Sequence, residues 1–303
     1  MGTPTDETAR QYRGRLAPTP SGFLHLGHAR TFARAVRRAR ERGGKIILRI
    51  EDIDRERCKS EYAKAAIDDL RAAGFSWDEG PDVGGDFGPY VQSLRFELYR
   101  RALLNLIRGG RVYPCEVSRS RIREESAAEE AAHAARPKPF DDAECEPLFP
   151  LRLRNAGGER LARRAAQNPF SFNWRFAARE GERVRFCDGN FGEMIFEAQK
   201  DFGDFLVWRK CGAPSYELAV CADDAAMKIT EVVRGADLLL STARQLLLYR
   251  ALGLNPPEFF HCRLMRDADG KKMSKSSMRE CRAESMLIRN SPEAAGEFLK
   301  RDL

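Results

Sequence analysis

Two histidines stand in a short motif whose chemistry suits the displacement of a phosphate group. His25 and His28 flank Leu26 and Gly27 in the stretch RGRLAPTPSGFLHLGHARTF, where a strand is predicted to turn into a helix. Glycine lets a ligand approach the backbone, and the free N–H groups of a helix N-terminus bind phosphate oxygens. Histidine side chains there can stabilise the charge that grows during the displacement. Taken alone, the same residues are equally typical of an ordinary turn and helix cap.

A lysine-rich motif lies near the other end of the chain. Lys271, Lys272 and Lys275 stand among serine, glycine and aspartate residues in the stretch DADGKKMSKSSM at 267–278. Such a loop can close over a triphosphate and neutralise charge as pyrophosphate leaves. A lone pair of lysines at this spacing is more typical of a solvated surface loop, but the two motifs together favour nucleotide chemistry.

The elements that must position the histidine motif form a strand, a helix and a second strand. The pattern predicts a strand in RGRLAP, then a helix in ARTFARAVRRARERGG that ends at Gly43 and Gly44. The stretch KIILRIED, almost continuously apolar at its start, is typical of a strand buried on both faces. The helix is expected to turn four apolar residues inward: Ala29, Phe32, Ala33 and Val36.

The same alternation continues along the chain. Helices are expected near 60–73 and 92–109, a strand in MKITEVVRGAD and a helix in STARQLLLYRALG. Strands that alternate with helices predict an α/β fold with a mostly parallel, Rossmann-like sheet. Between them, 113–190 lacks this rhythm and contains an Ala/Glu-rich segment that is expected to be a solvated helix.

We therefore expect a catalytic domain interrupted by a mixed α+β insertion and followed by a short helical part. The four expected parts are residues 1–112, the first half of the catalytic domain; 113–190, the insertion; 191–266, the second half; and 267–303, the lysine loop and a C-terminal helical segment.

Composition narrows the class of protein. The chain has 303 residues, 43% of them hydrophobic, which is enough for one large domain or two modest ones. It has no run of about 18 apolar residues and no signal-peptide pattern, so a cytoplasmic protein with no membrane partner is expected. Eight cysteines without a CxxC pair are expected to be mostly reduced and buried. A net charge of +7 favours a polyanionic partner such as nucleic acid.

In order and position, HLGH at 25–28 and KMSKS at 272–276 resemble the two signature motifs of class I aminoacyl-tRNA synthetases. The stretches RLAPTPSGFLHLGHART, LRIEDIDRER and EVVRGADLLLSTARQ are similar to the glutamyl branch, over about residues 13–278. The few residues that follow cannot form an anticodon-binding domain. This shortness resembles the glutamyl-queuosine tRNA(Asp) synthetases, stand-alone catalytic domains that attach glutamate to queuosine in the anticodon of tRNA(Asp).

The resemblance implies a role for each matching residue. The implied catalytic residues are His25, His28, Lys272 and Lys275. The implied ATP-binding residues are Pro18, Gly27, His28 and Lys275, with Mg²⁺ accompanying the ATP. The implied glutamate-binding residues are Arg15, Ala17, Thr19, Glu51, Tyr216 and Arg234. Two cationic forks for carboxylates and an anion for the ammonium suit free glutamate. Ordinary strand-end ion pairs and a core tyrosine are the alternative interpretation of these residues.

One part of the family pattern is missing. The family commonly binds zinc in its insertion through a Cys-x-Cys pair followed by Tyr and Cys, but here Cys115 is followed by Val117, and Asp141 precedes Cys145. Two cysteines supply only half of a tetrahedral site, even though His133 or Glu116 could contribute. We therefore expect packing in place of the metal, with zinc as the alternative.

The expected partners are glutamate, ATP and the anticodon stem-loop of tRNA(Asp), bound by a monomer. Basic residues of the insertion are candidates for the RNA backbone: Arg152, Arg154, Arg163, Arg164 and Arg175. A solvated basic face is the alternative for any one of them. Two other functions stay open: a truncated glutamyl-tRNA synthetase that loads a tRNA 3′ end or another acceptor, and a non-catalytic tRNA-binding module.

Overall fold

The computed structural model describes residues 11–24, 26–132, 147–154 and 156–264. His25 and the lysine-rich stretch 267–278 lie outside these residues, as does the C-terminal helical segment expected from the sequence.

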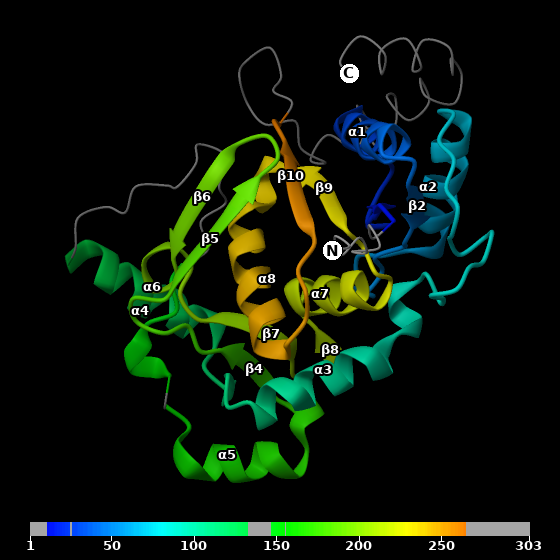
Figure 1. The fold of residues 1–303 in the computed structure, drawn as a ribbon. Coiled ribbons are helices and arrows are strands. Elements are labelled where there is room, and N and C mark those ends of the chain that lie inside the picture. The colour runs from blue at the N-terminus through cyan, green and yellow to red at the C-terminus, as the bar shows by residue number, and fades with distance from the viewer. Residues whose placement is uncertain (1–10, 25, 133–146, 155, 265–303) are drawn as a thin grey trace, which may run out of the picture.

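Two groups of strands, one of two strands and one of four, lie together as a mostly parallel sheet at the centre of the molecule (Figure 1). Its strands are β1 (Arg13–Leu16), β2 (Lys45–Leu48), β9 (Glu231–Gly235), β10 (Glu258–Cys262), β5 (Arg183–Asp188) and β6 (Gly192–Glu197). β1 pairs with β2, and β10 pairs with β9 and β5, all in parallel, while β6 is antiparallel to β5. The two groups meet where the Thr230 N–H, next to β9, donates to the Arg13 carbonyl at 2.9 Å.

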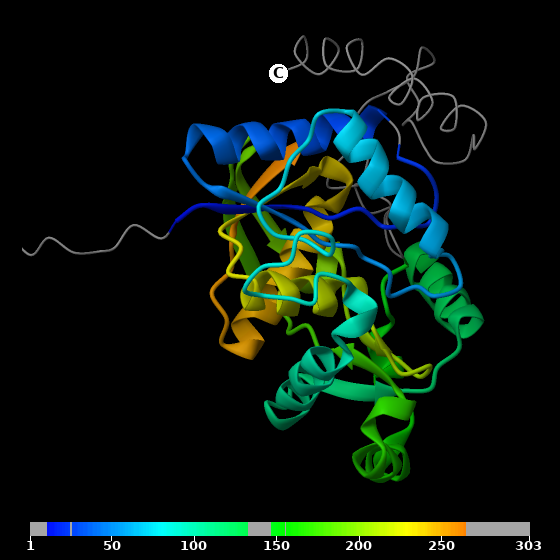
Figure 2. The same cartoon turned by 90° about the vertical axis from the view of Figure 1, so that its right-hand side faces the viewer.

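Helices cover both faces of this sheet (Figures 1 and 2). The helices are α1 (Leu26–Glu41) and α2 (Ser60–Ala72) on one side and α7 (Tyr216–Ala226) and α8 (Leu239–Leu252) on the other. Because strand side chains alternate, Ile46 and Leu48 pack into one apolar cluster with α1, and Ile47 packs into another with α7 and α8. The prediction of a strand buried on both faces is confirmed.

A second, antiparallel sheet lies below the first. Its order is β3 (Val112–Cys115), β4 (Asn173–Phe176), β7 (Phe205–Arg209) and β8 (Ala213–Pro214). The other helices are α3 (Phe96–Arg108), α4 (Arg119–Ala132), α5 (Gly158–Gln167), α6 (Ala198–Asp201) and the 3₁₀ turns Gln92–Leu94, Leu151–Leu153, Pro169–Ser171 and Ala236–Leu238. α5 projects from the lower end of the molecule (Figure 1).

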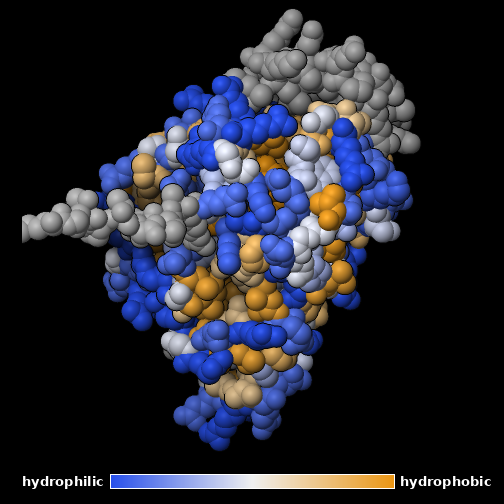
Figure 3. All heavy atoms as spheres, turned by 45° about the vertical axis from the view of Figure 1, so that its right-hand side comes forward, coloured by the Kyte–Doolittle hydropathy of each residue, from blue (hydrophilic) through white to orange (hydrophobic). Residues whose placement is uncertain are grey.

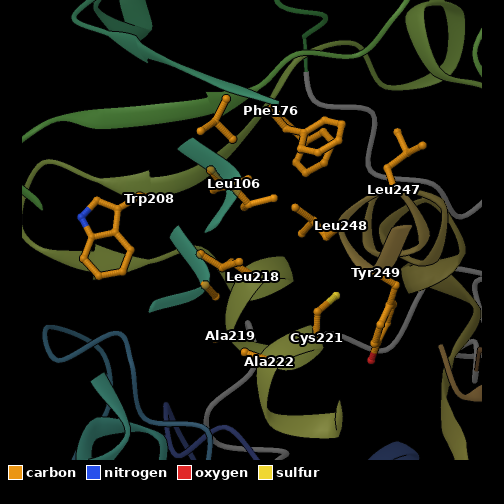
Figure 4. Close-up of a cluster of buried hydrophobic side chains, with 14 of the residues drawn as sticks. Leu106, Phe176, Trp208, Leu218, Ala219, Cys221, Ala222, Leu247, Leu248 and Tyr249 are labelled. Atoms are coloured by element: carbon orange, nitrogen blue, oxygen red, sulfur yellow. The ribbon is translucent and has the colours of Figure 1, made fainter. Parts of the chain in front are cut away.

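The largest core lies between the two sheets. Figure 4 shows side chains of this cluster, among them Trp208 from β7, Leu218 from α7 and Leu248 from α8. All three are buried completely, so α7 and α8 are held by apolar contacts on both sides. The face of the molecule in Figure 3 is mostly hydrophilic, with hydrophobic residues gathered in its lower half.

One carboxylate ties α1 to the sheet. Glu231, at the start of β9, accepts hydrogen bonds from Arg38 at 2.6 and 2.7 Å, from Arg42 at 3.1 Å and from the Tyr12 hydroxyl at 2.7 Å. Burial alone would raise the pKa of Glu231, but the hydrogen bonds from Arg38 and Tyr12 outweigh it and lower that pKa. The C-terminal end of α1 is therefore fixed against β9.

The α/β fold with a parallel sheet is confirmed, and so are the expected strand–helix–strand unit and the inward face of its helix. The four-part division of the chain stays a prediction. None of the helices in the described ranges is both long and apolar enough to span a bilayer.

The six described cysteines are free thiols, but Cys187 and Cys211 are exposed, so the expectation of burial is wrong for these two. Cys187 points outward because of the alternation along β5, and Cys211 lies in the turn after β7.

The close approach of β1 and β2 makes Gly44 a test of this fold. A Cβ on Gly44 would lie 2.5 Å from the Tyr12 carbonyl oxygen, which accepts the Lys45 N–H at 2.9 Å. Gly44→Ala should lower the free energy of unfolding in urea by about 1–3 kcal/mol, because the backbone must shift. Gly22→Ala is the control, since a Cβ there meets nothing within 4 Å. Equal stability of the two variants would contradict this reading of the β1–β2 contact.

Candidate functional site

Two buried guanidinium groups come from neighbouring strands of the parallel sheet. Arg15 on β1 and Arg234 on β9 are each 4% exposed, and Arg15 Nη1 donates to the Val233 carbonyl at 2.7 Å. Arg15 Nε and Arg234 Nη1 are buried and have no hydrogen-bond partner. Burial lowers the pKa of Arg15. Because an unpaired buried donor is costly, these two N–H groups indicate a site for an added acceptor.

A cluster of acidic groups lies beside them, around a guanidinium with no exposed surface. Arg49, just after β2, donates to Glu51 Oε1 at 2.8 Å and to Asp224 Oδ1 at 2.6 Å, with Asp223 Oδ2 at 3.8 Å. Burial raises the pKa of Glu51, and the charges of Arg49 and Arg15 oppose that rise. Asp224 Oδ2 is buried without a partner. Asp223 also binds Arg95 at 2.6 Å, so Glu51 and Asp224 share Arg49, and the unpaired Asp224 oxygen can accept from an added donor.

A pocket of about 410 Å³ opens next to this cluster. Glu51, Thr19 and Tyr216 are part of its wall. Tyr216 begins α7, where the Ser215 hydroxyl caps the helix by accepting the Leu218 N–H at 3.3 Å. Burial raises the pKa of Tyr216 to about 12, so its hydroxyl stays protonated at neutral pH and can donate. The other residues that line the pocket are Ile53, Asp54, Arg57, Gln92, Phe205, Leu206, Arg209, Ser215, Glu217 and Arg244.

The structure brings together four of the six residues predicted to bind glutamate. Arg234 has the largest charge effect on the Tyr216 hydroxyl, and Glu51 and Arg15 follow. Neither arginine is among the residues that line the pocket. Of the other two, Thr19 lies in the wall and Ala17 is half-buried in the loop after β1.

The turn that is predicted to bind phosphate lies between β1 and α1, and its role stays a prediction. The loop that follows β1 contains the buried Pro18, whose carbonyl accepts the Glu51 N–H at 3.0 Å. Gly27 and the half-buried His28 lie in the first turn of α1, and the His28 ring stacks on Phe32 with 6.4 Å between ring centroids. His25, Lys272 and Lys275 lie outside the described residues, so their roles stay predictions.

Sequence reasoning missed three polar residues of this region. Arg49 interrupts an apolar strand, Asp224 interrupts the apolar helix α7, and Gln245 is 1% exposed in α8 with its amide nitrogen unpaired. A charged residue in an otherwise buried element requires a partner of opposite charge. That signal predicts that Arg49 has an acidic partner, but it does not say which one.

Among the described residues, the surroundings of Cys115 do not supply the ligands of a zinc site. Cys115 is buried in a small apolar cluster with Ile122, Phe149 and Leu153, and Val117 packs against the same cluster. None of these neighbours is a metal ligand. Among the residues described by the structure, no group of three or more His, Cys, Asp or Glu side chains is arranged to hold a metal ion. Cys145, Asp141 and His133 lie outside that part of the chain.

The five arginines of the insertion divide into two kinds. Arg154 is bound to Asp204 at 2.6 and 2.8 Å, and Arg175 lies 4.3 Å from the centre of the Phe149 ring. These two residues attach the segment 147–154 to the antiparallel sheet, so the alternative of a solvated basic face does not describe them, and their contact with RNA stays a prediction. The other three are more exposed and pair with glutamates at the surface: Arg152, Arg163 and Arg164.

Comparisons with known proteins agree with this geometry. The family model described as tRNA synthetases class I (E and Q), catalytic domain, matches residues 11–295. A glutamyl-Q tRNA(Asp) synthetase from Symbiobacterium thermophilum is 48% identical over 263 residues, covering 86% of this chain and 77% of that protein. Another, from Nitratidesulfovibrio vulgaris, is 42% identical over 270 residues, covering 87% and 77%.

A solved structure has the same fold. The glutamate tRNA ligase from Elizabethkingia meningosepticum, crystallised in complex with its amino acid, superposes with a TM-score of 0.74 at 30% identity. The match covers 89% of this chain and 53% of that one, so this chain spans about half of its length.

The charge arrangement of the pocket predicts that Glu51 is needed to bind the ammonium of an amino acid. Glu51→Gln should weaken glutamate binding by about 2–5 kcal/mol, because it removes one partner of a buried charge pair. Isothermal titration calorimetry measures the affinity, with thermal unfolding measured alongside.

Glu217→Gln is the matched control, since Glu217 is in the same pocket wall but pairs with Arg244 at the longer distance of 3.8 Å. The control should bind glutamate within about threefold of the unchanged protein, because a longer and weaker pair contributes little. An equal loss of glutamate affinity in both variants would show that Glu51 is not specifically needed to bind the ammonium.

Proposed function

The chain belongs to the class I tRNA synthetases for glutamate and glutamine, and within them to the glutamyl-Q tRNA(Asp) synthetases, and on this premise we propose that it activates glutamate with ATP and transfers the glutamyl group to queuosine in the anticodon of tRNA(Asp). It is a ligase of the aminoacyl-tRNA synthetase type. We expect it to act in the cytoplasm as a monomer.

The observation that carries the proposal is the set of unpaired buried groups beside the pocket. Arg15 Nε and Arg234 Nη1 are donors without acceptors, and Asp224 Oδ2 is an acceptor without a donor. Glutamate has two carboxylates and one ammonium, which are the complementary groups. We assign Arg15 and Tyr216 to the side-chain carboxylate and Glu51 to the ammonium.

Activation joins the glutamate α-carboxylate to the nucleotide. A carboxylate oxygen attacks the α-phosphorus of ATP, the bond from that phosphorus to the bridging oxygen breaks, and pyrophosphate leaves. Mg²⁺ bound with the ATP would supply positive charge to the phosphate oxygens. His28 in the first turn of α1, with His25 before it, would bind the charge that develops on the phosphoryl oxygens. Lys272 and Lys275 would neutralise the departing pyrophosphate.

Transfer needs a hydroxyl close to the resulting adenylate. The cyclopentenediol of queuosine is chemically similar to the ribose diol at a tRNA 3′ end. Either hydroxyl could attack the glutamyl carbonyl carbon, forming the ester and releasing AMP, without different catalytic residues. The choice between these acceptors must therefore come from how the RNA docks.

The exposed arginines of the insertion are our candidates for the RNA backbone. Arg163 pairs with Glu159 at 2.7 Å within α5, and Arg164 lies 3.5 Å from Glu116. Exposed ion pairs of this kind contribute little to stability. An RNA phosphate can therefore replace the Glu159 or Glu116 carboxylate as the partner of the arginine. Such contacts carry little sequence information, which leaves the modified base to supply specificity.

The pocket predicts strong discrimination among amino acids. Glutamine should bind at least about a hundredfold more weakly than glutamate, because a neutral amide cannot compensate for the desolvation of buried guanidinium groups. Aspartate, one methylene shorter, should also bind poorly because it cannot reach both ends of the pocket. Calorimetry with the three amino acids measures this. Affinities within a few-fold of each other would contradict the assignment of Arg15 and Tyr216.

The acceptor is tested by locating labelled glutamate on tRNA(Asp). After charging with radioactive glutamate, nuclease fragments of the tRNA should carry the label in the anticodon fragment. The matched control is tRNA(Asp) without queuosine, which should remain unlabelled. Label in the 3′-terminal fragment, or equal labelling of both tRNAs, would instead support a glutamyl-tRNA synthetase that loads the 3′ end. An RNA that binds but never becomes labelled would support a non-catalytic module.

A further inference from the structure

A chain of buried polar side chains runs through the sheet from β5 through β10 to β9. Asp188 at the end of β5 contacts His261 on β10, and His261 contacts Arg234 on β9. Their exposed fractions are 2%, 0% and 4%. No part of the proposed chemistry uses Asp188 or His261, and buried polar groups of this kind are expensive unless each is satisfied.

Asp188 is fixed by the backbone around it. Its Oδ1 accepts the backbone N–H groups of Asn190 and Phe191, each at 3.0 Å. The backbone nitrogen of His261 lies 3.2 Å from Oδ2. Burial would raise the pKa of Asp188, but the hydrogen bond from His261 and these backbone donors lower it. An ionised carboxylate can only accept, so the 2.6 Å contact with His261 Nδ1 places a proton on Nδ1.

The second ring nitrogen of His261 is therefore an acceptor. Burial lowers the pKa of His261 to about 4, so the ring is neutral at physiological pH and carries one proton. With that proton on Nδ1, Nε2 has a free lone pair. Two donors are within reach of it: Arg234 Nε at 3.2 Å, and the Thr242 hydroxyl at 2.9 Å, whose single proton also faces the Leu238 carbonyl at 3.1 Å. A proton on Nε2 would instead face both donors.

These contacts use one side of the Arg234 guanidinium. Nε donates to His261, and Nη2 donates to Thr242 Oγ1 at 2.7 Å and to Gln245 Oε1 at 2.8 Å. Nη1 is left buried and unpaired, and the Gln245 amide nitrogen is unpaired as well. Arg234 also has the largest charge effect on Tyr216, which is part of the pocket wall.

We propose that Asp188 and His261 are positioning residues for amino-acid binding, which hold Arg234 by its Nε and Nη2 edge so that Nη1 is presented to a carboxylate of the substrate. This inference rests on the proposed function, because it takes that carboxylate to belong to glutamate. Asp188 selects the His261 tautomer, and the tautomer selects the orientation of Arg234. The same logic applies to histidines whose ring orientation is set by a carboxylate partner.

Two substitutions of His261 separate its two nitrogens. His261→Asn keeps an N–H near Nδ1 for Asp188 but has no acceptor near Nε2, whereas His261→Gln keeps an acceptor near Nε2. His261→Asn should weaken glutamate binding about tenfold or more in calorimetry, because it removes a hydrogen bond of a charged group. His261→Gln should lose clearly less. ATP affinity should change in neither.

Asp188→Asn tests the tautomer directly. An amide can donate to Nδ1, which moves the ring proton to Nε2, so side-chain nitrogen NMR should report the opposite tautomer. With only four histidines in the chain, the His261 signal can be assigned from its loss in His261→Asn. Glutamate affinity should fall in Asp188→Asn, while Asp82→Asn, a surface substitution next to Arg71, should change neither measurement.

Arg234→Ala distinguishes the failure of this inference from the failure of the proposed function. If Arg234→Ala loses glutamate binding while the folded His261→Asn and Asp188→Asn variants bind normally, the positioning role is wrong and glutamate recognition stands. If Arg234→Ala binds glutamate normally, the assignment of Arg234 is itself wrong. Should His261→Asn fail to fold, the tautomer and affinity of Asp188→Asn decide, and an unchanged tautomer overturns the proposal.

Discussion

Arg49 carries a charge in a part of the molecule that water does not reach, and the position of several elements follows from how that charge is balanced. Its guanidinium contacts Glu51 next to β2 and both Asp223 and Asp224 in α7. Removing water from such a group costs several kcal/mol, so its partners must be close and well oriented. Helix α7 therefore cannot shift along the sheet without leaving a buried charge unpaired.

The same constraint extends to α3 and to the pocket. Asp223 accepts hydrogen bonds from Gln92, Arg95 and Tyr99 at 2.6–2.9 Å, which attaches the start of α3 to α7. Tyr216 is the first residue of α7, so the pocket wall is positioned by the same ion pairs. The groups that we propose to recognise glutamate are thus placed by elements that depend on one another, which is the condition for a preorganised site.

The sequence predicted much of the parallel part of the fold, because its signals there are local. The apolar run at 45–50 and the 3.6-residue spacing in α1 can be recognised within a few residues. The partners of Arg49 could not be identified in this way, since Asp224 is 175 residues away in the chain. The sequence also could not show which insertion arginines are exposed and which are bound within the protein, because only the folded sheet places Asp204 within 2.6 Å of Arg154. The candidate residues Arg15, Glu51, Tyr216 and Arg234 came from family motifs, whereas Gln245, His261 and Asp188 required the three-dimensional arrangement.

The carboxylate of Glu231 has a consequence for how this protein can evolve. Arg38, Arg42 and Tyr12 all donate to it, and it is almost fully buried. A change at any one of these four positions alters the environment of the other three, so their effects on stability should not add. Tyr12, Arg38, Arg42 and Glu231 should therefore be inherited as a unit: in a lineage of this enzyme, substitutions at these positions should occur together or be absent, even though the residues are spread over 220 positions of the chain.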